Sequence, residues 1–229
     1  PYAIADLRVE LTTAQAAVPV GSWRSVGHSH TAFATECFLD ELIHAAGLDP
    51  VAARRALLAG KPRELACLEL AAAKAGWGTP LPAGVGRGVA VHASFESVCA
   101  QVIEASVEHG RIVVRRVVAA VHCGRAVNPG LVAAQLESAI VFGLSAACKQ
   151  QITFRRGRAQ ETNFGSYRSV RMFECPVIET HIVPSTDDPT GVGEPGLPPV
   201  TGALGNALFA ATGQRLRSLP FEAALEGAS

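Results

Sequence analysis

The sequence predicts an α+β fold made of two subdomains, and three observations predict it. Apolar residues recur at helical spacing through much of the first 76 residues. From Gly86 the pattern changes to the period of two that is typical of strands. A connector rich in glycine and proline, residues 77–84, separates the two patterns. We therefore expect a helix-rich part over 1–84 and a mixed sheet with helices over 85–229.

The first part is expected to hold one strand and three helices. Residues 2–11 alternate well enough between apolar and polar to predict a strand. The helices are predicted over 31–46, 50–58 and 62–76. Asp49 and Pro50 are typical of an N-cap and a first-turn proline, and Gly47 is typical of the end of the preceding helix.

The second part begins with three strands, which are predicted over 88–95, 97–107 and 111–122. The remaining elements are a helix over 129–149, a short hairpin around Gly157, a strand over 177–183 and a last helix over 201–213. A loop of roughly 15 residues starts at Pro184, and loops of that length in a compact chain usually have a function.

The composition excludes several classes of protein. The chain of 229 residues has 20 basic and 20 acidic residues, 48% hydrophobic residues and 17% charged residues, so it is not a disordered chain. The neutral balance argues against a nucleic-acid binder, and a solvated strand face explains the densest basic set, Arg155, Arg156 and Arg158. The low share of charge suggests that a partner covers part of the surface. No run of about 18 apolar residues occurs, so no membrane-spanning helix is expected.

The chain begins with Pro1 and has no initiator methionine. We therefore expect a fragment, a processed subunit or one piece of a split protein. The compartment stays open between cytoplasm and periplasm, because the absence of a leader from such a chain says little.

Metal binding by side chains of this chain is not expected. The six cysteines are spread evenly without a CxxC pair, which argues against a zinc or iron–sulfur site. His28 and His30 place two imidazoles on one side of an extended segment, but no third ligand is evident. The alternative is a hydrogen-bonded pair before a helix. His92 and His122 lie in predicted strands and are interpreted as structural residues.

The segment 191–196 reads GVGEPG and matches the GxGxxG pattern of dinucleotide-binding loops. Three prolines, at 195, 198 and 199, argue against a helix that starts within this loop, and the acidic residue expected about 20 positions later is missing. An independent NAD-binding domain is therefore not supported.

Glu194 is the notable residue of this loop, because it is a lone carboxylate among glycine, proline and apolar residues. Glycines allow the backbone to approach a ligand closely, and a carboxylate shielded from water is suited to act as a general base. The alternative is a carboxylate that caps the following helix. Gln135 likewise has two interpretations, a core polar group or an amide that contacts a ligand.

Four segments in order resemble the molybdenum-binding large subunit of the xanthine dehydrogenase / aldehyde oxidase family, and the isoquinoline 1-oxidoreductase β-subunit type most closely. They are SWRSVGHSHTAFATECFLDELIHAAGLDP (22–50), VHCGRAVNPGLVAAQLESAIVFGLSAA (121–147), NFGSYRSVRMFECPVIETHIVPS (163–185) and GVGEPGLPPVTGALGNALFAATG (191–213). Their order and spacing agree across nearly the whole chain. The chain is thus identified as the C-terminal part of such a subunit.

The resemblance implies a reaction and the residues that take part in it. Family members hydroxylate an aldehyde, or a ring carbon beside nitrogen, with water as the oxygen source. The family's base toward the molybdenum-bound hydroxyl falls on Glu194, and its cofactor-contacting glutamine falls on Gln135. The loop near the molybdenum suggests cofactor contacts at Trp23, Arg24 and Gly27, and the glycine loop suggests one at Gly193. Val26 takes a pocket-lining position where relatives have an aromatic residue. With no cationic partner expected nearby, low water contact alone would prepare the base.

The resemblance also implies a cofactor and partners. The expected cofactor is molybdopterin cytosine dinucleotide, with iron–sulfur clusters in a partner subunit and none in this chain. The expected partners are the upstream portion of the large subunit, the iron–sulfur small subunit and an aldehyde or N-heterocycle as substrate. About two thirds of the usual subunit is missing, so the chain alone is not expected to bind the cofactor tightly. A non-catalytic, truncated fragment is the alternative.

Two departures from the family pattern bear on the site. His122 stands where many relatives have Asp, and Glu137-Ser138-Ala139 replaces a Glu-Gly-Gly run. The added side chains are expected to crowd the cofactor.

Overall fold

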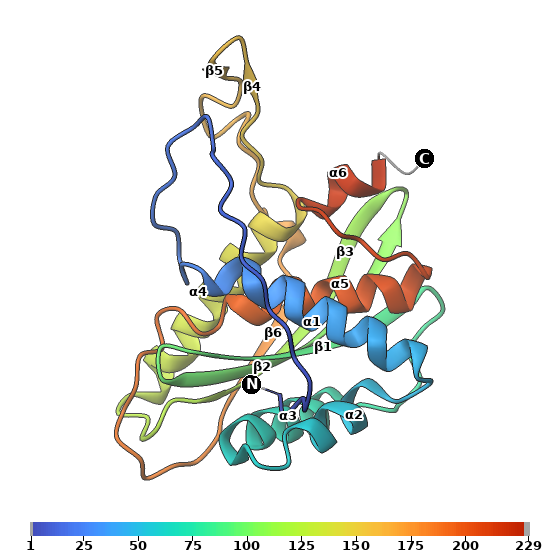
Figure 1. Ribbon diagram of the computed structural model, residues 1–229, viewed down its shortest axis with the longest axis vertical. Coiled ribbons are helices and arrows are strands. Elements are labelled where there is room, and N and C mark those ends of the chain that lie inside the picture. Colours follow the sequence, from blue (N-terminus) through green and yellow to red (C-terminus); the bar gives the residue numbers. More distant parts are fainter. Residues whose placement is uncertain (1, 227–229) are drawn as a thin grey trace.

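The structure, a computed structural model, describes residues 2–226 of the chain and shows a four-stranded mixed sheet between helical layers (Figure 1). The helices are α1 (His28–Ala45), α2 (Pro50–Leu57), α3 (Pro62–Ala75), α4 (Pro129–Cys148), α5 (Pro198–Thr212) and α6 (Phe221–Glu226), with a 3₁₀ turn over Met172–Glu174. The strands are β1 (Val85–Ser94), β2 (Ser97–Glu108), β3 (Arg111–His122), β4 (Phe154–Arg155), β5 (Arg158–Ala159) and β6 (Val177–Ile182). The predicted α+β class is confirmed.

The main sheet has the order β1-β2-β3-β6. Its first three strands form an antiparallel meander, whereas β6 pairs with β3 in parallel, after the chain has passed through α4 and the β4–β5 hairpin. Both faces of β2 are buried, because Ile103 faces the core shared with α4 and α5 while Val102 faces the core shared with α3. This double burial explains the nearly continuous apolar run in β2.

Helix α5 lies directly on β1, and two glycines of β1 permit this close approach. A Cβ atom built on Gly88 would lie 2.2 Å from the Ala207 nitrogen and 2.3 Å from the Ala203 oxygen. A Cβ atom built on Gly86 would also lie too close to backbone atoms of α5. The glycines therefore set the distance between the sheet and α5, the helix that follows the Glu194 loop.

We expect Gly88→Ala to lower the free energy of unfolding by about 1–3 kcal/mol or more, because the added methyl group meets backbone atoms that cannot rotate away. Urea unfolding of the purified chain measures the effect. Gly60→Ala is the control, since no atom lies within 4 Å of its added Cβ. Equal stability of the two variants would contradict this account of the interface.

The predicted helix boundaries are largely confirmed by the capping contacts. The Asp49 side chain accepts hydrogen bonds from the Val51 and Ala52 amides at the start of α2, and Gly76 ends α3 in the left-handed conformation. Helix α5 begins at Pro198, earlier than predicted. Prolines in the first helical turn lose no hydrogen bond, so they start this helix and do not block it.

The predicted strand over 2–11 is wrong. This segment is irregular and mostly exposed, and its alternating residues Leu7, Val9 and Leu11 are 67%, 82% and 92% exposed. A strand needs a neighbouring strand to bond with, and within residues 2–226 none pairs with this segment. Near its start the Ala3 amide donates to the Leu57 carbonyl, and the Tyr2 hydroxyl accepts from Arg54 Nε at 3.2 Å.

Helix α4 differs from the expectation in its composition. It is the one helix of the described residues that is long and apolar enough to cross a membrane, with 20 residues and a mean hydropathy of 1.6 over its most apolar window. Half of that window is buried inside the molecule, where α4 packs against α5 and β6. A buried core helix has the same composition, so this feature is weak evidence for a membrane segment.

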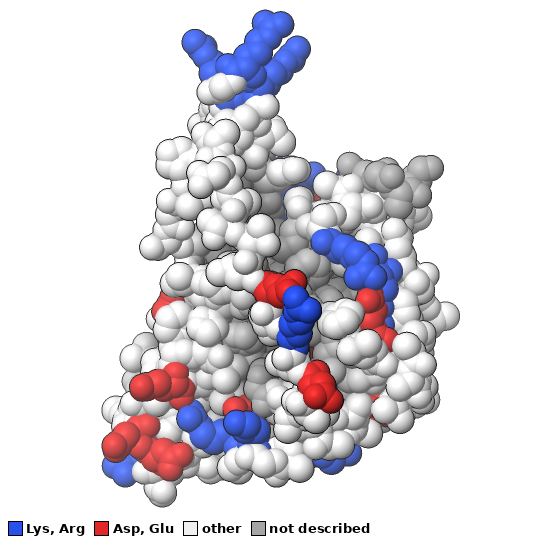
Figure 2. Space-filling model, viewed as in Figure 1, with Lys and Arg blue, Asp and Glu red and all other residues white. Residues whose placement is uncertain are grey.

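The β4–β5 hairpin stands out from the body at the top of both views (Figures 1 and 2). Arg155, Arg156 and Arg158 are exposed at its tip, where Figure 2 shows a basic group. None of the three forms an ion pair within the described part of the chain. This agrees with the solvated strand face expected for them.

Candidate functional site

A polar cluster joins three segments that are far apart in the sequence: the loop 23–27 before α1, the first turns of α4, and the glycine loop 191–197 before α5. The predicted residues Arg24, Gln135, Gly193 and Glu194 all belong to it. The fold thus brings four of the seven predicted site residues into one hydrogen-bonded network.

Arg24 is the centre of this network. Its Nε donates to the Gly193 carbonyl at 2.7 Å, and Nη1 donates to the Ser138 hydroxyl at 3.1 Å. Its Nη2 donates to both the side-chain oxygen (3.2 Å) and the main-chain oxygen (3.3 Å) of Gln135. Four of the five guanidinium N–H groups are used in this way, so Arg24 holds the three segments together and keeps one donor free.

The charge of Arg24 lies close to Glu194. Partial burial lowers the pKa of Arg24, and the Glu194 carboxylate acts in the opposite direction. An arginine stays protonated in either case. The expectation that Glu194 has no cationic neighbour is therefore wrong, because the arginine comes from a segment 170 positions earlier in the chain.

Glu194 is half-buried and is held through one of its two carboxylate oxygens. Oε1 accepts from the Ser25 amide at 3.0 Å, and the Ser25 hydroxyl donates to the Glu194 carbonyl at 2.8 Å. Oε2 has no hydrogen bond from any residue between 2 and 226. The carboxylate does not cap α5, which begins without a side-chain cap, so the structure speaks against the capping alternative.

The Ser25 contact requires an unusual backbone. Ser25 and Val26 both have positive φ angles, 73° and 47°, a conformation that costs about 1–2 kcal/mol for residues other than glycine. Ser25 is fully buried and its hydrogen bonds to Glu194 hold this conformation. Strain of this kind is often retained at functional sites.

Gln135 lies on the exposed side of α4, so its interpretation as a core polar group is wrong. Its Oε1 accepts from Arg24, whereas its Nε2 has no partner among the described residues. A free carboxylate oxygen on Glu194, a free amide on Gln135 and open space at Gly193 thus surround the same network.

Ser138 and Ala139, which replace the two glycines of the family's Glu-Gly-Gly run, both have defined contacts in the structure. Ser138 accepts a hydrogen bond from Arg24, so its hydroxyl is part of the network. Ala139 is buried, and a Cβ built on Gly196 would lie 3.1 Å from its methyl carbon. The expected crowding of a cofactor by these side chains stays a prediction.

The other predicted contacts lie on the loop before α1. The Trp23 ring stacks on Phe142 of α4 with ring centres 5.0 Å apart. Val26 is exposed and forms the surface of the loop, and Gly27 is the residue before α1, where its carbonyl accepts from Thr31. None of these three forms a hydrogen bond with Glu194.

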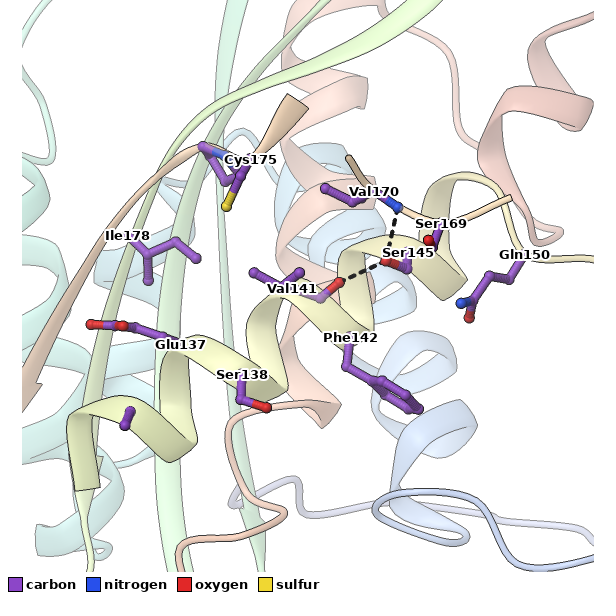
Figure 3. Close-up of a pocket in the computed structure, with 12 residues that line it drawn as sticks. Glu137, Ser138, Val141, Phe142, Ser145, Gln150, Ser169, Val170, Cys175 and Ile178 are labelled. Carbon is purple, nitrogen blue, oxygen red and sulfur yellow. Dashed lines mark hydrogen bonds between the residues drawn. The ribbon is translucent and has the colours of Figure 1, made fainter. Parts of the chain in front are cut away.

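A cavity of about 750 Å³ lies beside the network, between α4 and the segment 169–178 (Figure 3). Glu137 and Val141 on α4 lie on the side of the helix where Cys175 and Ile178 are found, whereas the Ser138 and Phe142 side chains extend to the other side. At its far end the Val170 amide donates to the Ser145 hydroxyl, which donates to the Val141 carbonyl. Its lining residues include one carboxylate, Glu137, and no basic side chain.

His28 and His30 have different surroundings in the structure. His28 and His30 lie in the first turn of α1 and not in an extended segment, because the helix begins three residues earlier than predicted. His28 Nδ1 is 2.9 Å from Nε2 of His92 on β1, while His30 is exposed. No group of three or more potential metal ligands occurs in the described part of the chain. The structural interpretation of His92 agrees with this contact.

Burial lowers the pKa of His92 to about 4, and the neighbouring His28 acts in the same direction. The unfolded chain binds this proton near pH 6.5, so the unfolded state gains more protons on acidification. We expect stability to fall as pH falls from about 6.5 to 4, by at most about 1.4 kcal/mol per pH unit from this group. Urea unfolding across this range measures the slope.

His92→Gln should flatten this slope, and a variant of the exposed turn residue, His109→Gln, should not. An NMR titration of His92 with a midpoint near 6.5 would contradict the expectation.

Ser25 and Ser138 were not identified as site residues from the sequence. No sequence feature indicated a role for Ser25 except its place next to Arg24. Ser138 had one, because it replaces a glycine in the family pattern directly after the block that contains Gln135.

The layered sheet and the polar network define an α+β domain in which a carboxylate oxygen of Glu194 and the amide of Gln135 are left without partners among the described residues where α4 meets the glycine loop. The chain belongs to the molybdopterin cofactor-binding domain family, whose model matches residues 31–176. The resemblance to the xanthine dehydrogenase / aldehyde oxidase family is thereby confirmed.

Similar proteins agree with this family. The chain is 32% identical to isoquinoline 1-oxidoreductase subunit beta of Brevundimonas diminuta, over 98% of this chain and 29% of that protein. It is 31% identical, over 87% of this chain, to a protein of Gluconacetobacter polyoxogenes named membrane-bound aldehyde dehydrogenase [pyrroloquinoline-quinone], again covering 29% of it. The chain therefore spans less than a third of the length of these relatives.

The fold is also found in a solved structure. Aldehyde oxidoreductase from Desulfovibrio gigas superposes with a TM-score of 0.66 over 87% of this chain and 40% of that chain, at 13% identity. At this identity the likeness supports the fold alone.

Proposed function

We propose that this chain is the C-terminal portion of a molybdenum hydroxylase large subunit, in which Glu194 is the catalytic base. The substrate is an aldehyde or an N-heteroaromatic compound, whose C–H bond is oxidised with water as the oxygen donor. The observation that carries the proposal is the network in which Arg24 and Ser25 hold the Glu194 loop and leave Glu194 Oε2 free.

The residues around Glu194 suit a molybdopterin cofactor. The free amide of Gln135 and the remaining N–H of Arg24 can donate to a polar ring system or an oxo group. Gly193 leaves open space beside them, and Trp23 and Gly27 lie on the adjoining loop. When bound, the cofactor supplies a metal centre that accepts two electrons and oxygen from water.

The chain's own residues have distinct tasks in this reaction. Glu194 takes up a proton at its free Oε2, while the Ser25 amide orients the carboxylate through Oε1. Arg24 fixes the main chain at Gly193, so that the carboxylate keeps its place when substrate binds. Val26 faces outward at the loop and contributes to the substrate pocket.

The complete enzyme requires more than this chain. We infer that the upstream portion of the large subunit supplies the other walls of the cofactor site, and that an iron–sulfur small subunit receives the electrons. The cofactor is the cytosine dinucleotide form. The two parts of this chain, 1–84 and 85–229, are proposed as regions of the first and second molybdopterin-binding parts of the subunit.

Oxygen labelling of the assembled enzyme tests this function. With isoquinoline as the probe, ¹⁸O-labelled water, unlabelled O₂ and an artificial electron acceptor, we expect one ¹⁸O atom in the oxidised product. Molybdenum analysis of the same sample should find the metal bound. A product that carries unlabelled oxygen, taken from O₂, would contradict the proposal. An assembled sample that contains no molybdenum and oxidises neither isoquinoline nor aldehydes would favour the alternative of a non-catalytic, truncated fragment.

A further inference from the structure

The Glu194 loop, taken here as residues 187–197, has a second set of anchors besides its contacts with Arg24 and Ser25. Its first half, residues 187–191, lies against the end of β3 and the turn between β1 and β2. The Thr190 amide donates to the Cys123 carbonyl at 3.0 Å, and the Arg125 amide donates to the Asp187 carbonyl at 2.9 Å. A Cβ on Gly124 would lie 2.0 Å from the Asp188 oxygen, so the two backbones are in close contact there.

Ser97 connects this half of the loop to the sheet. Its hydroxyl lies 2.7 Å from the Gly191 carbonyl and 2.7 Å from the Thr190 hydroxyl. A carbonyl can only accept, so Ser97 donates to Gly191 and accepts from Thr190. Ser97 is 1% exposed, which shields both hydrogen bonds from water.

Ser97 itself follows a strained turn. The two residues between β1 and β2, Phe95 and Glu96, have φ angles of 52° and 61°, where a two-residue turn prefers Asn-Gly. The Arg63 side chain on α3 donates from Nη2 to the Glu96 carbonyl and holds this turn. Such a conformation persists only where its surroundings determine it.

Arg63 also reaches the other end of the same loop through His122. Its Nε donates to Nδ1 of His122 at 3.1 Å, and His122 Nε2 faces the Asp187 carboxylate at 3.6 Å. Since Arg63 can only donate, Nδ1 must be free of a proton and the imidazole proton is on Nε2, toward Asp187. Besides Arg63 and Asp187, the charge of Glu64 also acts on the pKa of His122.

We propose that Arg63, Ser97 and His122 form a brace that positions the first half of the Glu194 loop. The brace holds the loop from the sheet side, while Arg24 and Ser25 hold its second half from the side of α1 and α4. These three are positioning residues, because they act on residues 187–191, through side-chain and main-chain groups, and form no hydrogen bond with Glu194. Their effect on turnover rests on the proposed function of Glu194, but their effect on the loop does not.

Amide hydrogen exchange on the 229-residue chain tests the brace directly. We expect Ser97→Ala to speed the exchange of the Thr190 amide by about 10-fold, since two buried hydrogen bonds that fix it are lost. Ser106→Ala is the matched control, because Ser106 is a buried serine at the opposite end of β2 whose hydroxyl donates to Glu108 and not to the Glu194 loop. Equal exchange at Thr190 in the two variants would overturn the proposal.

A second pair of variants separates positioning from simple loss of packing. Asn at position 122 can place an oxygen where His122 has Nδ1, so His122→Asn should keep slow exchange at Thr190 and Arg125. His122→Leu fills the space without an acceptor and should speed exchange at both amides relative to amides in the centre of β2. If Asn behaves like Leu, the hydrogen bond from Arg63 does not act as proposed.

Turnover of the assembled enzyme gives the link to function. We expect Ser97→Ala to lower kcat several-fold with little change in KM, because substrate binding is kept while the base is held less firmly. If Glu194→Gln left turnover unchanged, the proposed function would fail while the exchange results still decided on the brace. If the exchange results were as expected but kcat stayed constant, the loop would not be the element that positions the base.

Discussion

Replacement of Glu194 by glutamine is expected to cut turnover of the assembled enzyme by about 10²–10⁴-fold or more while the molybdenum content stays the same. Glutamine keeps the side-chain oxygen that accepts from the Ser25 amide, so the loop geometry is preserved. It loses the free carboxylate oxygen that takes up the proton. The measurement is kcat with an aldehyde and with isoquinoline, together with molybdenum analysis of each preparation.

A carboxylate outside the site serves as the control for this experiment. Glu41 on α1 pairs with Arg217, so Glu41→Gln removes a partly exposed carboxylate and should leave kcat unchanged. Loss of molybdenum in parallel with activity in Glu194→Gln would mean that Glu194 holds the cofactor site together. Unchanged turnover with full molybdenum content would exclude Glu194 as the base.

Local patterns predicted most of the helices and strands because the physical cause of each element lies within it. The Asp49-Pro50 start of α2 depends on atoms three residues apart, and the meander of β1 to β3 depends on alternation within each strand and on short turns. The strand over 2–11 failed because pairing requires a neighbour, and the sequence of the segment contains no information on whether one is present.

The candidate site could likewise be predicted only where the evidence lies within one segment of the sequence. Glu194 could be identified from its surroundings in the sequence, since a carboxylate among glycines and prolines is unusual. The hydrogen-bond partners could not, because Ser25, Ser97 and Ser138 come from three different segments that only the fold brings to this loop. The presence of Arg24 next to Glu194 is the clearest case. It changed the expected electrostatics of the base from an isolated carboxylate to one beside a fixed positive charge.

Below α1 the structure contains a buried charge cluster that composition alone did not indicate. The Arg54 side chain is 0% exposed and donates to the Glu36 carboxylate at 3.1 Å, with Asp40 at 3.5 Å. Glu36 is also 0% exposed, and its Oε2 accepts from the Val91 amide of β1, so the cluster connects α1 and α2 to the sheet. Burial raises the pKa of Glu36, and Arg54 acts against this effect.

Replacement of Arg54 by methionine is therefore expected to lower the free energy of unfolding by about 3–5 kcal/mol, because the buried Glu36 carboxylate loses the cation that compensates it, whereas Asp40 keeps its pair with Arg215 at 2.8 Å. Urea unfolding near neutral pH measures the loss, and Arg55→Met is the matched control. Arg55 is next in the sequence but its side chain is half exposed and pairs with Glu69 at the surface, where an ion pair contributes about 0–1 kcal/mol.

Adding Glu36→Gln to Arg54→Met should recover part of the loss, since a neutral amide costs less to bury than a carboxylate. If Arg54→Met and Arg55→Met were equally stable, the cluster would not hold α1 and α2 on the sheet, and the support for the loop that contains Arg24 would have to come from elsewhere.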